Sequence, residues 1–275
     1  MGPSTMSTGV FFGGGAWASL YYVGVIESLR ASDRKVSCAG GSSAGALFAL
    51  GMMLDKNDAE LRGLWLELAE LGHVHGCITK VSIYHDLVLR RWLPDGGNEY
   101  TRLNGRLFVG ITIFPATAEL LDTWSSNHQL RDDIHASMHI PMYSGITTER
   151  FAIDGGFSKS FWDLPGMDRT IHVSPFERHA HVTPPWFSLR HIIWPAYKPS
   201  TREGLENQGR LDMSAYLDTS KTTTPAGWRY FAALFCCRVC LLTVSWPIFL
   251  LLRTPKYMSK ICEHVRDRIS KPVTE

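Results

Sequence analysis

Glycine-rich turns separate short apolar runs from helical patterns at the start of the chain. A strand-like run, a glycine turn and apolar residues at helical spacing follow one another twice within the first 54 residues. The two units are strand 10–12, turn 13–15 and helix 20–29, then strand 35–39, turn 40–45 and helix 46–54. Two such units in succession predict a parallel α/β sheet with its glycine turns on one edge.

The pattern of helices and strands continues as far as residue 217. Asn57 or Asp58 is a suitable cap for the helix that starts there. Proline, histidine and tryptophan crowd residues 175–199, which indicates irregular surface structure around a short apolar helix. The other predicted elements are helices 57–71, 84–92, 130–138 and 201–217 and strands 106–114, 151–153 and 170–173.

A block of 23 apolar residues, 230–252, follows this region and contains Arg238 as its single charge. It is long enough to cross a hydrocarbon core of about 30 Å as a helix. Arg238 and Pro247 argue against a simple span, while basic residues at both ends also suit an interfacial or re-entrant segment. We therefore expect a globular domain at 1–220 and, at 221–275, a tail that associates with a membrane or lipid droplet.

Composition and charge narrow the class of protein. The chain has 275 residues, 45% of them hydrophobic and 20% charged, which is typical of a globular protein and not of a disordered or disulfide-rich one. A net charge of +2, without a run of more than two basic residues, argues against nucleic acid as a partner. The N-terminus has no pattern of a secretory signal, so we expect a protein that is not secreted and six reduced cysteines. Three of these lie in the apolar block, where palmitoylation is an alternative to simple packing: Cys236, Cys237 and Cys240.

The second glycine turn carries a candidate nucleophile. Residues 41–45, Gly-Ser-Ser-Ala-Gly, match the G-x-S-x-G pattern that places a serine on a sharp turn between a strand and a helix. Gly41 and Gly45 relieve crowding around the turn, Ser43 becomes exposed, and the helix that follows offers N–H groups to an anion. Both the apolar strand and the apolar helix that this pattern requires are present.

The first glycine turn has two interpretations. Backbone N–H groups of Gly13, Gly14 and Gly15 could form an oxyanion hole, because glycine has no side chain to shield them. Alternatively, Gly13, Gly15 and Ala18 fit a relaxed dinucleotide-binding pattern, with Asp33 near the position of a ribose-binding acid. The second interpretation predicts an oxidoreductase and leaves the serine turn without a role.

A candidate acid comes directly after the strand at 151–153. Asp154 is followed by Gly155 and Gly156, and an acid at a strand's C-terminal end can face a serine at the same sheet edge. Together the three glycine turns predict acyl transfer by a serine. Spacing alone leaves open whether a histidine takes part; the candidates are His172, His179 and His181. A metal is not expected, because the short cluster of His73, His75 and Cys77 has no second set with ligand spacing.

An ordered set of segments between about Gly9 and Leu217 resembles the patatin-like phospholipases, most of all the adipose triglyceride lipase (adiponutrin) branch. The segments are FFGGGAWASLYYVGVIESL, GGSSAGAL, LNGRLFVGIT, HASMHIPMYSG, FAIDGGFSKS, TIHVSPF and RLDMSAYL. This resemblance implies a three-layer α/β/α fold with a mostly parallel sheet, and a dyad of Ser43 as nucleophile and Asp154 as its partner without histidine. It implies no metal or organic cofactor.

The oxyanion loop departs from the G-x-G-x-x-G that the family shows. Aligned on residues 21–25, the sequence has Ala16 at the second glycine and Ser19 at the third. Aligned on the glycines, Ala18 replaces the last one.

The resemblance as a whole implies a lipase or phospholipase at the cytoplasmic face of a membrane or lipid droplet. Its substrates would be carboxylic esters of neutral lipids such as triacylglycerol, or of phospholipids. The alternatives are a catalytically weak scaffold on lipid surfaces and an acylglycerol transacylase, and a protein co-activator is a further expected partner.

Overall fold

The computed structural model describes residues 6–113, 116–141, 143–145, 152–177, 179–185 and 188–221. The predicted apolar segment 230–252, the cysteines within it and all but the first residue of the predicted tail 221–275 lie outside these residues. No helix in the described ranges is long and apolar enough to cross a membrane.

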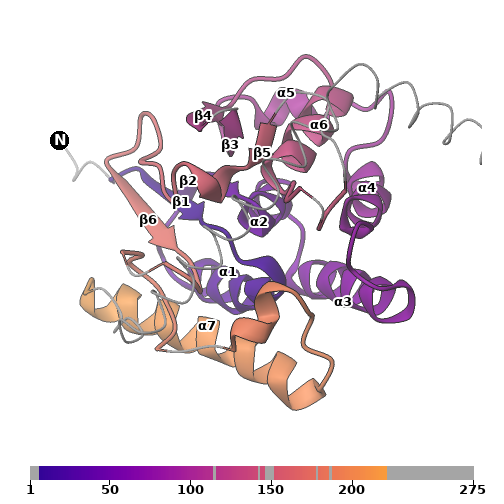
Figure 1. Cartoon of the computed structure of the whole chain (residues 1–275). Coiled ribbons are helices and arrows are strands. Elements are labelled where there is room, and N and C mark those ends of the chain that lie inside the picture. The colour runs from indigo at the N-terminus through magenta and orange to yellow at the C-terminus, as the bar shows by residue number, and fades with distance from the viewer. Residues whose placement is uncertain are drawn as a thin grey trace, which may run out of the picture. The chain divides into compact units, whose positions relative to one another are not determined.

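A mostly parallel sheet forms the centre of the described domain (Figure 1). Its strands are ordered β4-β3-β2-β1-β6, and β5 pairs with β3. The pairings β3–β2, β2–β1 and β1–β6 are parallel, whereas β4 and β5 run antiparallel to β3. The strands are β1 (Thr8–Phe12), β2 (Val36–Ser42), β3 (Leu107–Ile113), β4 (Thr117–Leu121), β5 (Ala152–Asp154) and β6 (Arg169–Val173). The predicted mixed α/β fold with a mostly parallel sheet is confirmed.

Helices connect the strands and supply most of the core. The α-helices are α1 (Tyr21–Ala31), α2 (Ala44–Met53), α3 (Asp58–His75), α4 (Val81–Trp92), α5 (Glu99–Leu103), α6 (Asn127–Ser137) and α7 (Pro199–Thr219). Short 3-10 turns are η1 (Ala16–Leu20), η2 (Gly155–Phe157) and η3 (Leu189–Ile192). The predicted cap of α3 is confirmed: the Asn57 side chain accepts the Glu60 N–H, and the Glu60 carboxylate accepts the Asn57 N–H.

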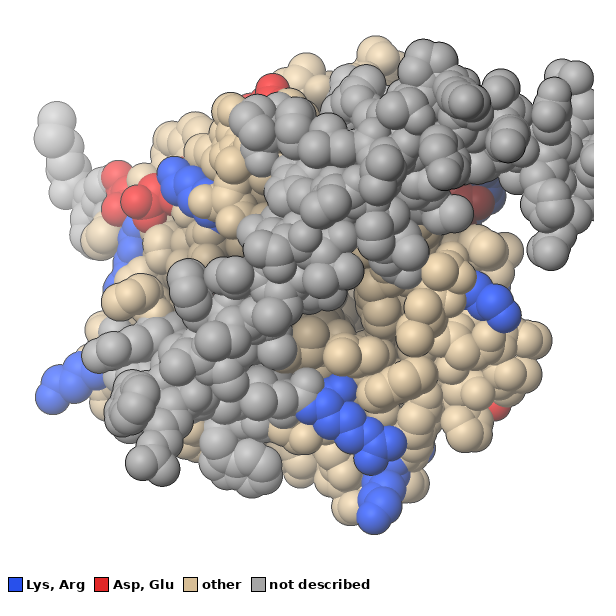
Figure 2. All heavy atoms as spheres, in the orientation of Figure 1, with Lys and Arg blue, Asp and Glu red and all other residues tan. Residues whose placement is uncertain are grey.

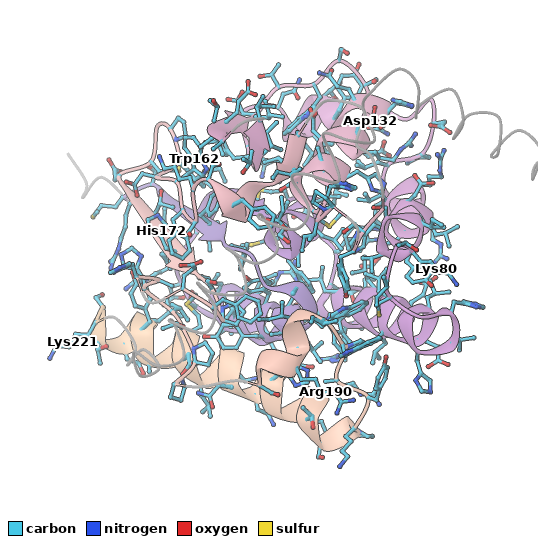
Figure 3. All side chains as sticks on the ribbon, viewed as in Figure 1. Lys80, Asp132, Trp162, His172, Arg190 and Lys221 are labelled. Atoms are coloured by element: carbon cyan, nitrogen blue, oxygen red, sulfur yellow. The ribbon has the colours of Figure 1, made fainter. Side chains whose placement is uncertain are left out.

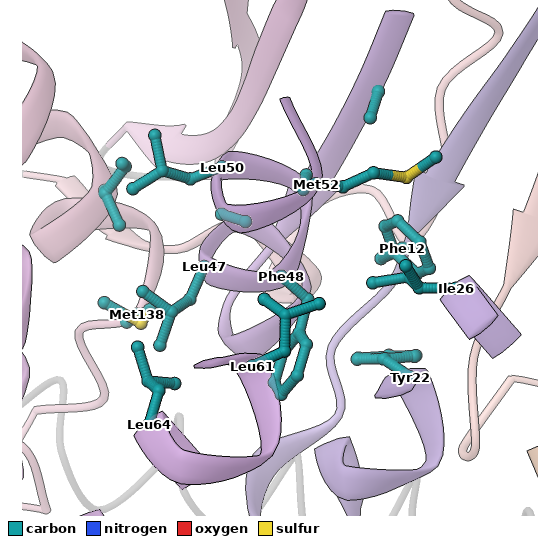
Figure 4. Packing of buried hydrophobic residues seen from close by; sticks show 14 of the residues in the cluster. Phe12, Tyr22, Ile26, Leu47, Phe48, Leu50, Met52, Leu61, Leu64 and Met138 are labelled. Carbon is teal, nitrogen blue, oxygen red and sulfur yellow. The ribbon is translucent and has the colours of Figure 1, made fainter. Parts of the chain in front are cut away.

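Alternation along β1 divides the core between the two faces of the sheet. Val10 and Phe12 belong to the large cluster formed with the helices. Figure 4 shows Phe12 beside Tyr22 and Ile26 of α1, with α2 packed next to them. Phe11 belongs to a smaller cluster with Cys38, Phe108 and Leu164. Helix α2 is apolar all round because its whole surface is buried between the sheet and its neighbouring helices.

Two glycines allow helices α1 and α7 to cross closely. A Cβ on Gly24 would lie 1.9 Å from the Glu206 carbonyl oxygen, and one on Gly209 would lie 2.0 Å from the Tyr21 carbonyl oxygen. The backbones therefore touch at the crossing. Arg210 of α7 also pairs with Glu27 of α1. In this way the end of the described domain is held against its beginning, and α7 forms an outer layer below α1 (Figure 1).

Candidate active site

Ser43 occupies the sharp turn between β2 and α2. Its backbone has φ 57° and ψ −137°, a conformation that costs a non-glycine residue on the order of 1–3 kcal/mol and clusters at functional sites. The turn leaves no room for side chains at its two predicted glycines. A Cβ on Gly41 would lie 2.3 Å from the Gly45 carbonyl carbon, and a Cβ on Gly45 would lie 2.1 Å from the Phe12 carbonyl oxygen. The G-x-S-x-G spacing thus matches a steric need.

The end of helix α6 holds the Ser43 backbone and is itself hydrogen-bonded to strand β3. The Ser43 N–H lies 3.0 Å from both the carbonyl oxygen and Oγ of Ser137, the last residue of α6. Ser137 Oγ in turn donates to the Gly110 carbonyl oxygen of β3 at 2.6 Å. These bonds satisfy the buried N–H at the turn and hold the strained backbone in place, while the Ser43 side chain remains at the edge of the sheet.

Strands β2 and β5 end head to head against one edge of β3. Ile111 pairs with Glu119 of β4 on one edge and with Asp154 of β5 on the other. That second edge also holds β2, where Ser42 pairs with Gly110. Successive residues of a strand are about 3.3 Å apart, so the C-terminal ends of β2 and β5 meet beside Gly110 and Ile111. The structure therefore brings Ser43 and Asp154, which are far apart in sequence, to the same place.

The backbone around Asp154 is fixed on several sides. The Asp154 N–H donates to the His139 carbonyl oxygen, and its own carbonyl oxygen accepts the Thr112 hydroxyl, both at 2.9 Å. The Gly156 N–H donates to carboxylate Oδ1 at 2.9 Å. A Cβ on Gly155 would lie 2.1 Å from the Gly110 carbonyl oxygen. Asp154 is 6% exposed, so its carboxylate is held in a nearly buried position.

The glycine loop lies beside Ser43. A Cβ built on Gly14 would lie 3.8 Å from the Ser43 Cβ. The prediction that all three glycines donate to an oxyanion needs one correction, because the Gly13 N–H already donates to the Val173 carbonyl oxygen at 2.8 Å. In the described part of the chain, no hydrogen bond joins the Gly14 or Gly15 N–H to an acceptor. These two groups are the donors that the loop can offer to a ligand.

Tyr22 and Ser174 hold the carbonyl groups of the glycine loop. The fully buried Tyr22 hydroxyl donates to the Gly13 carbonyl oxygen at 2.8 Å, and its ring leaves no space for a side chain on Gly15. Burial raises the pKa of Tyr22 well above its usual value, so the phenol remains a neutral donor. Ser174 Oγ donates to the Gly14 carbonyl oxygen at 3.3 Å. With their carbonyl oxygens held in this way, the loop's peptide planes are fixed.

Ala16 directly after the loop has φ 41°, a left-handed conformation that glycine adopts at little cost. In the alignment on residues 21–25 this is the position where the family shows its second glycine. The departure noticed in the sequence is thus visible as local backbone strain.

An apolar cavity of about 60 Å³ opens next to Ser43. Leu47, Leu64 and Met138 approach it from α2, α3 and the end of α6 (Figure 4). Its described lining contains no Lys, Arg, Asp or Glu, and burial lowers the pKa of its histidine, His85, to about 3, so that ring is uncharged at neutral pH. The cavity is therefore a site for apolar groups.

Tyr143 forms one wall of this cavity and connects two segments. The Trp17 indole N–H donates to the Tyr143 hydroxyl, which donates to the Ile193 carbonyl oxygen, each at 2.7 Å. Trp17 belongs to η1 and Ile193 follows η3. The cavity wall thus ties the segment after the glycine loop to the segment after η3.

Of the three histidines singled out by sequence, His172 and His181 have other partners, and His179 is exposed. His172 lies on β6, where its ring Nε2 is 3.2 Å from Asp163 Oδ1. The backbone N–H of His172 donates to His181 Nδ1. The described residues show no hydrogen bond between a histidine and Ser43. The His73 ring lies 4.6 Å from the Tyr197 ring, and no group of three or more His, Cys, Asp or Glu side chains among the described residues could hold a metal.

The dinucleotide interpretation fails on geometry. Asp33 precedes the first residue of β2, Val36, and so lies at the amino end of the strand. A ribose-binding acid belongs at the carboxyl end, near the glycine turn.

Sequence reasoning missed the residues that support the site. Ser137, Tyr22, Ser174 and Thr112 hold the turn, the loop and the acid in place, yet none belongs to a recognisable catalytic pattern. Each acts through a hydrogen bond to a backbone group in another segment, nine residues away for Tyr22 and at least 42 for the others, so local spacing contains no signal for it.

Comparison with known proteins agrees with this geometry. Human patatin-like phospholipase domain-containing protein 2 is 26% identical over 199 residues, which cover 67% of this chain and 39% of the relative. Mouse patatin-like phospholipase domain-containing protein 5 is 27% identical over 195 residues, 63% of this chain and 43% of the relative. The chain thus matches about two fifths of the length of these relatives.

A solved structure and a family model extend the comparison. The crystal structure of VipD from Legionella pneumophila shares the fold, with a TM-score of 0.55 at 12% identity over 78% of this chain and 67% of that one. The family model described as patatin-like phospholipase matches residues 10–162, which include both Ser43 and Asp154. This chain therefore belongs to the patatin-like phospholipase family.

Proposed function

We propose that the chain is a serine acyl hydrolase that cleaves carboxylic esters of lipids with Ser43 and Asp154. The observation that carries the proposal is the meeting of β2 and β5, which brings the ends carrying a strained serine and a held carboxylate together. Of the two residues, Ser43 also lines the apolar cavity. Membership of the patatin-like phospholipase family supports a lipid ester as the class of substrate.

The proposed reaction begins with attack of Ser43 Oγ on the ester carbonyl carbon. Asp154 accepts the serine proton, directly or through a water, and the Gly14 and Gly15 N–H groups stabilise the oxyanion of the tetrahedral intermediate. Each such donor is typically worth about 3–4 kcal/mol. The intermediate collapses with loss of the alcohol, which takes up a proton. Water then attacks the acyl-enzyme and releases the fatty acid; transfer to another glyceride would make the protein a transacylase.

The cavity gives the proposal its substrate chemistry. A cavity of about 60 Å³ is too small for a fatty acyl chain, which therefore enters only if side chains move. Leu47, Leu64 and Met138 are side chains that can change rotamer. We propose esters of neutral lipids such as triacylglycerol, or of phospholipids, as the substrates, met at a lipid surface.

The test is hydrolysis of a lipid panel by wild type, Ser43→Ala and Asp154→Asn. Triacylglycerol, phospholipid, retinyl ester and monoacylglycerol are each presented as an emulsion or in vesicles, and released fatty acid is measured. We expect both variants to lose turnover while retaining the wild-type thermal transition. Turnover of Ser43→Ala equal to wild type would refute the mechanism.

A catalytically weak scaffold on lipid surfaces is the second candidate, and the left-handed Ala16 is the observation that favours it. A fluorophosphonate probe separates the two. Labelling of wild type, lost in Ser43→Ala, supports the hydrolase. Failure to label folded wild type in the presence of lipid supports the scaffold.

A further inference from the structure

Exposed large apolar side chains of the described residues concentrate on one side of the domain. Six of the eight lie at the end of α3, between α3 and α4, along α4 and after η3. These are Val74, Ile78, Ile83, Leu87, Ile193 and Trp194, each at least 37% exposed. The other two, Met6 and Leu211, lie in different elements. An exposed apolar cluster marks an interaction site more often than chance exposure of single residues does.

Contacts join part of this cluster into one surface. The His73 ring lies 4.6 Å from the Tyr197 ring, which brings the end of α3 to the segment after η3. The Thr79 N–H donates to the Tyr143 carbonyl oxygen, and the Tyr143 hydroxyl donates to the Ile193 carbonyl oxygen. We call four residues on these joined segments the apolar rim: Val74, Ile78, Ile193 and Trp194.

The apolar rim adjoins the wall of the cavity beside Ser43 along the chain. Tyr143 lines the cavity, as do Ile192, which precedes Ile193, and Val81, which begins α4 just after Ile78. An apolar chain leaving the cavity on this side would therefore meet exposed apolar side chains. A hydrophobic path from Ser43 to the surface is what a lipid ester requires.

Unpaired cations flank the apolar rim. Lys80, Arg190 and Lys198 are exposed, and no carboxylate of the described residues forms an ion pair with them. Glu70 of α3 is the acid close to Tyr197 on this side. Figure 3 labels Lys80 and Arg190, and Figure 2 shows in the same orientation that uncharged residues make up most of the described surface on the lower right of this face. Arg190 and Lys198 also line a groove of about 700 Å³.

We infer that the apolar rim docks on a lipid–water interface with anionic head groups and holds the cavity mouth against the lipid. Tryptophan and isoleucine enter the boundary between head groups and acyl chains, while the three cations lie at the level of the phosphates. The inference deepens the proposed function and rests on it, because docking serves to bring a lipid ester to Ser43. It is separate from the predicted tail, because it concerns the domain itself.

Fluorescence quenching tests the docking surface in the full chain. The four cysteines beyond residue 221 are changed to serine, which leaves the buried Cys38 and Cys77. An environment-sensitive fluorophore is then attached to Ile78→Cys, Trp194→Cys or the control Leu211→Cys. On vesicles of phosphatidylcholine and phosphatidylserine containing spin-labelled lipid, we expect a blue shift and quenching at positions 78 and 194 and neither at 211. Equal signals at all three positions, or none at 78 and 194 in vesicle-bound protein, would overturn the inference.

Turnover provides a second measurement. Ile78→Ser/Trp194→Ser is expected to lose hydrolysis of vesicle or emulsion esters while retaining that of a soluble short-chain ester. Met6→Ser/Leu211→Ser, which changes two side chains that are more exposed than those of Ile78 and Trp194, is expected to retain both. Arg190→Gln/Lys198→Gln should weaken binding to anionic vesicles about fivefold per cation, with Lys35→Gln/Lys221→Gln as the control. Equal loss in rim and control variants would count against the apolar rim.

Repeating the quenching in Ser43→Ala separates the two proposals. Insertion of positions 78 and 194 without turnover in any background removes the hydrolase and keeps the docking surface. Turnover on vesicles without insertion keeps the hydrolase and removes the docking surface.

Discussion

Gly45 fixes the distance between helix α2 and strand β1, and Gly45→Ala measures how tightly that distance is set. The new Cβ would lie 2.1 Å from the Phe12 carbonyl oxygen and 2.3 Å from that of Gly13, where ordinary contact begins at 3.4 Å. Helix and strand must separate by about 1 Å, since neither neighbour is a side chain that can rotate. Overpacking of a core typically costs about 1–3 kcal/mol, and contact with backbone places this variant at the upper end, about 3 kcal/mol.

The assay is urea denaturation combined with hydrolysis. A loss of about 3 kcal/mol is a large share of a typical stability of 5–15 kcal/mol, so the midpoint should fall clearly at an unchanged m value. Turnover should fall as well, because the displaced carbonyl groups belong to the start of the glycine loop. Gly63→Ala is the control: its Cβ meets nothing within 4 Å in α3, so we expect a gain of about 1 kcal/mol. A loss below about 1 kcal/mol for Gly45→Ala, with normal turnover, would refute the steric argument.

Three further predictions concern other parts of the domain. Gly24→Ala should lower the free energy of unfolding, followed by thermal denaturation, by about 3 kcal/mol, because its Cβ would lie 1.9 Å from the Glu206 carbonyl oxygen. Gly204→Ala, with open space around it, should not destabilise the domain. Equal transition temperatures for the two variants would contradict the close crossing of α1 and α7. Ala16→Gly should gain about 1 kcal/mol in urea by relieving the left-handed backbone, and a loss would show that the conformation carries no strain. Burial lowers the pKa of His139 from 6.5 to about 4, so the unfolded chain takes up a proton first and stability falls as pH drops between these values. Urea titrations over this range should show His139→Leu losing less stability than wild type, by up to about 3 kcal/mol; parallel losses would mean that His139 is not the group responsible.

The turns proposed to carry the chemistry were predictable from sequence because each depends on local spacing. A strand, small residues and an apolar helix around Ser43 lead to the observed geometry through sterics within five residues. Asp154 was predictable for the same reason, as an acid between a strand and two glycines. The position of one relative to the other was not, since it depends on β5 pairing antiparallel to β3 at Ile111.

Features that depend on which strands pair could not be predicted. Strand β4 is half exposed and mixed in polarity, and pairing with β3 is what makes it a strand. The role of Gly13 also depends on a partner: hydrogen bonding between β1 and β6 continues one residue beyond Phe12, and this engages its N–H. Sequence shows where glycines are, but not which of their N–H groups the sheet uses.

The hydroxyl of Tyr143 has a consequence for how the domain responds to force. A phenol has one hydrogen to donate, and here it goes to Ile193 while the oxygen accepts the Trp17 indole. A shift of the Ile193 carbonyl group breaks one of these bonds unless Trp17 moves with it. Displacement at the surface is therefore mechanically coupled to the residues that follow the glycine loop.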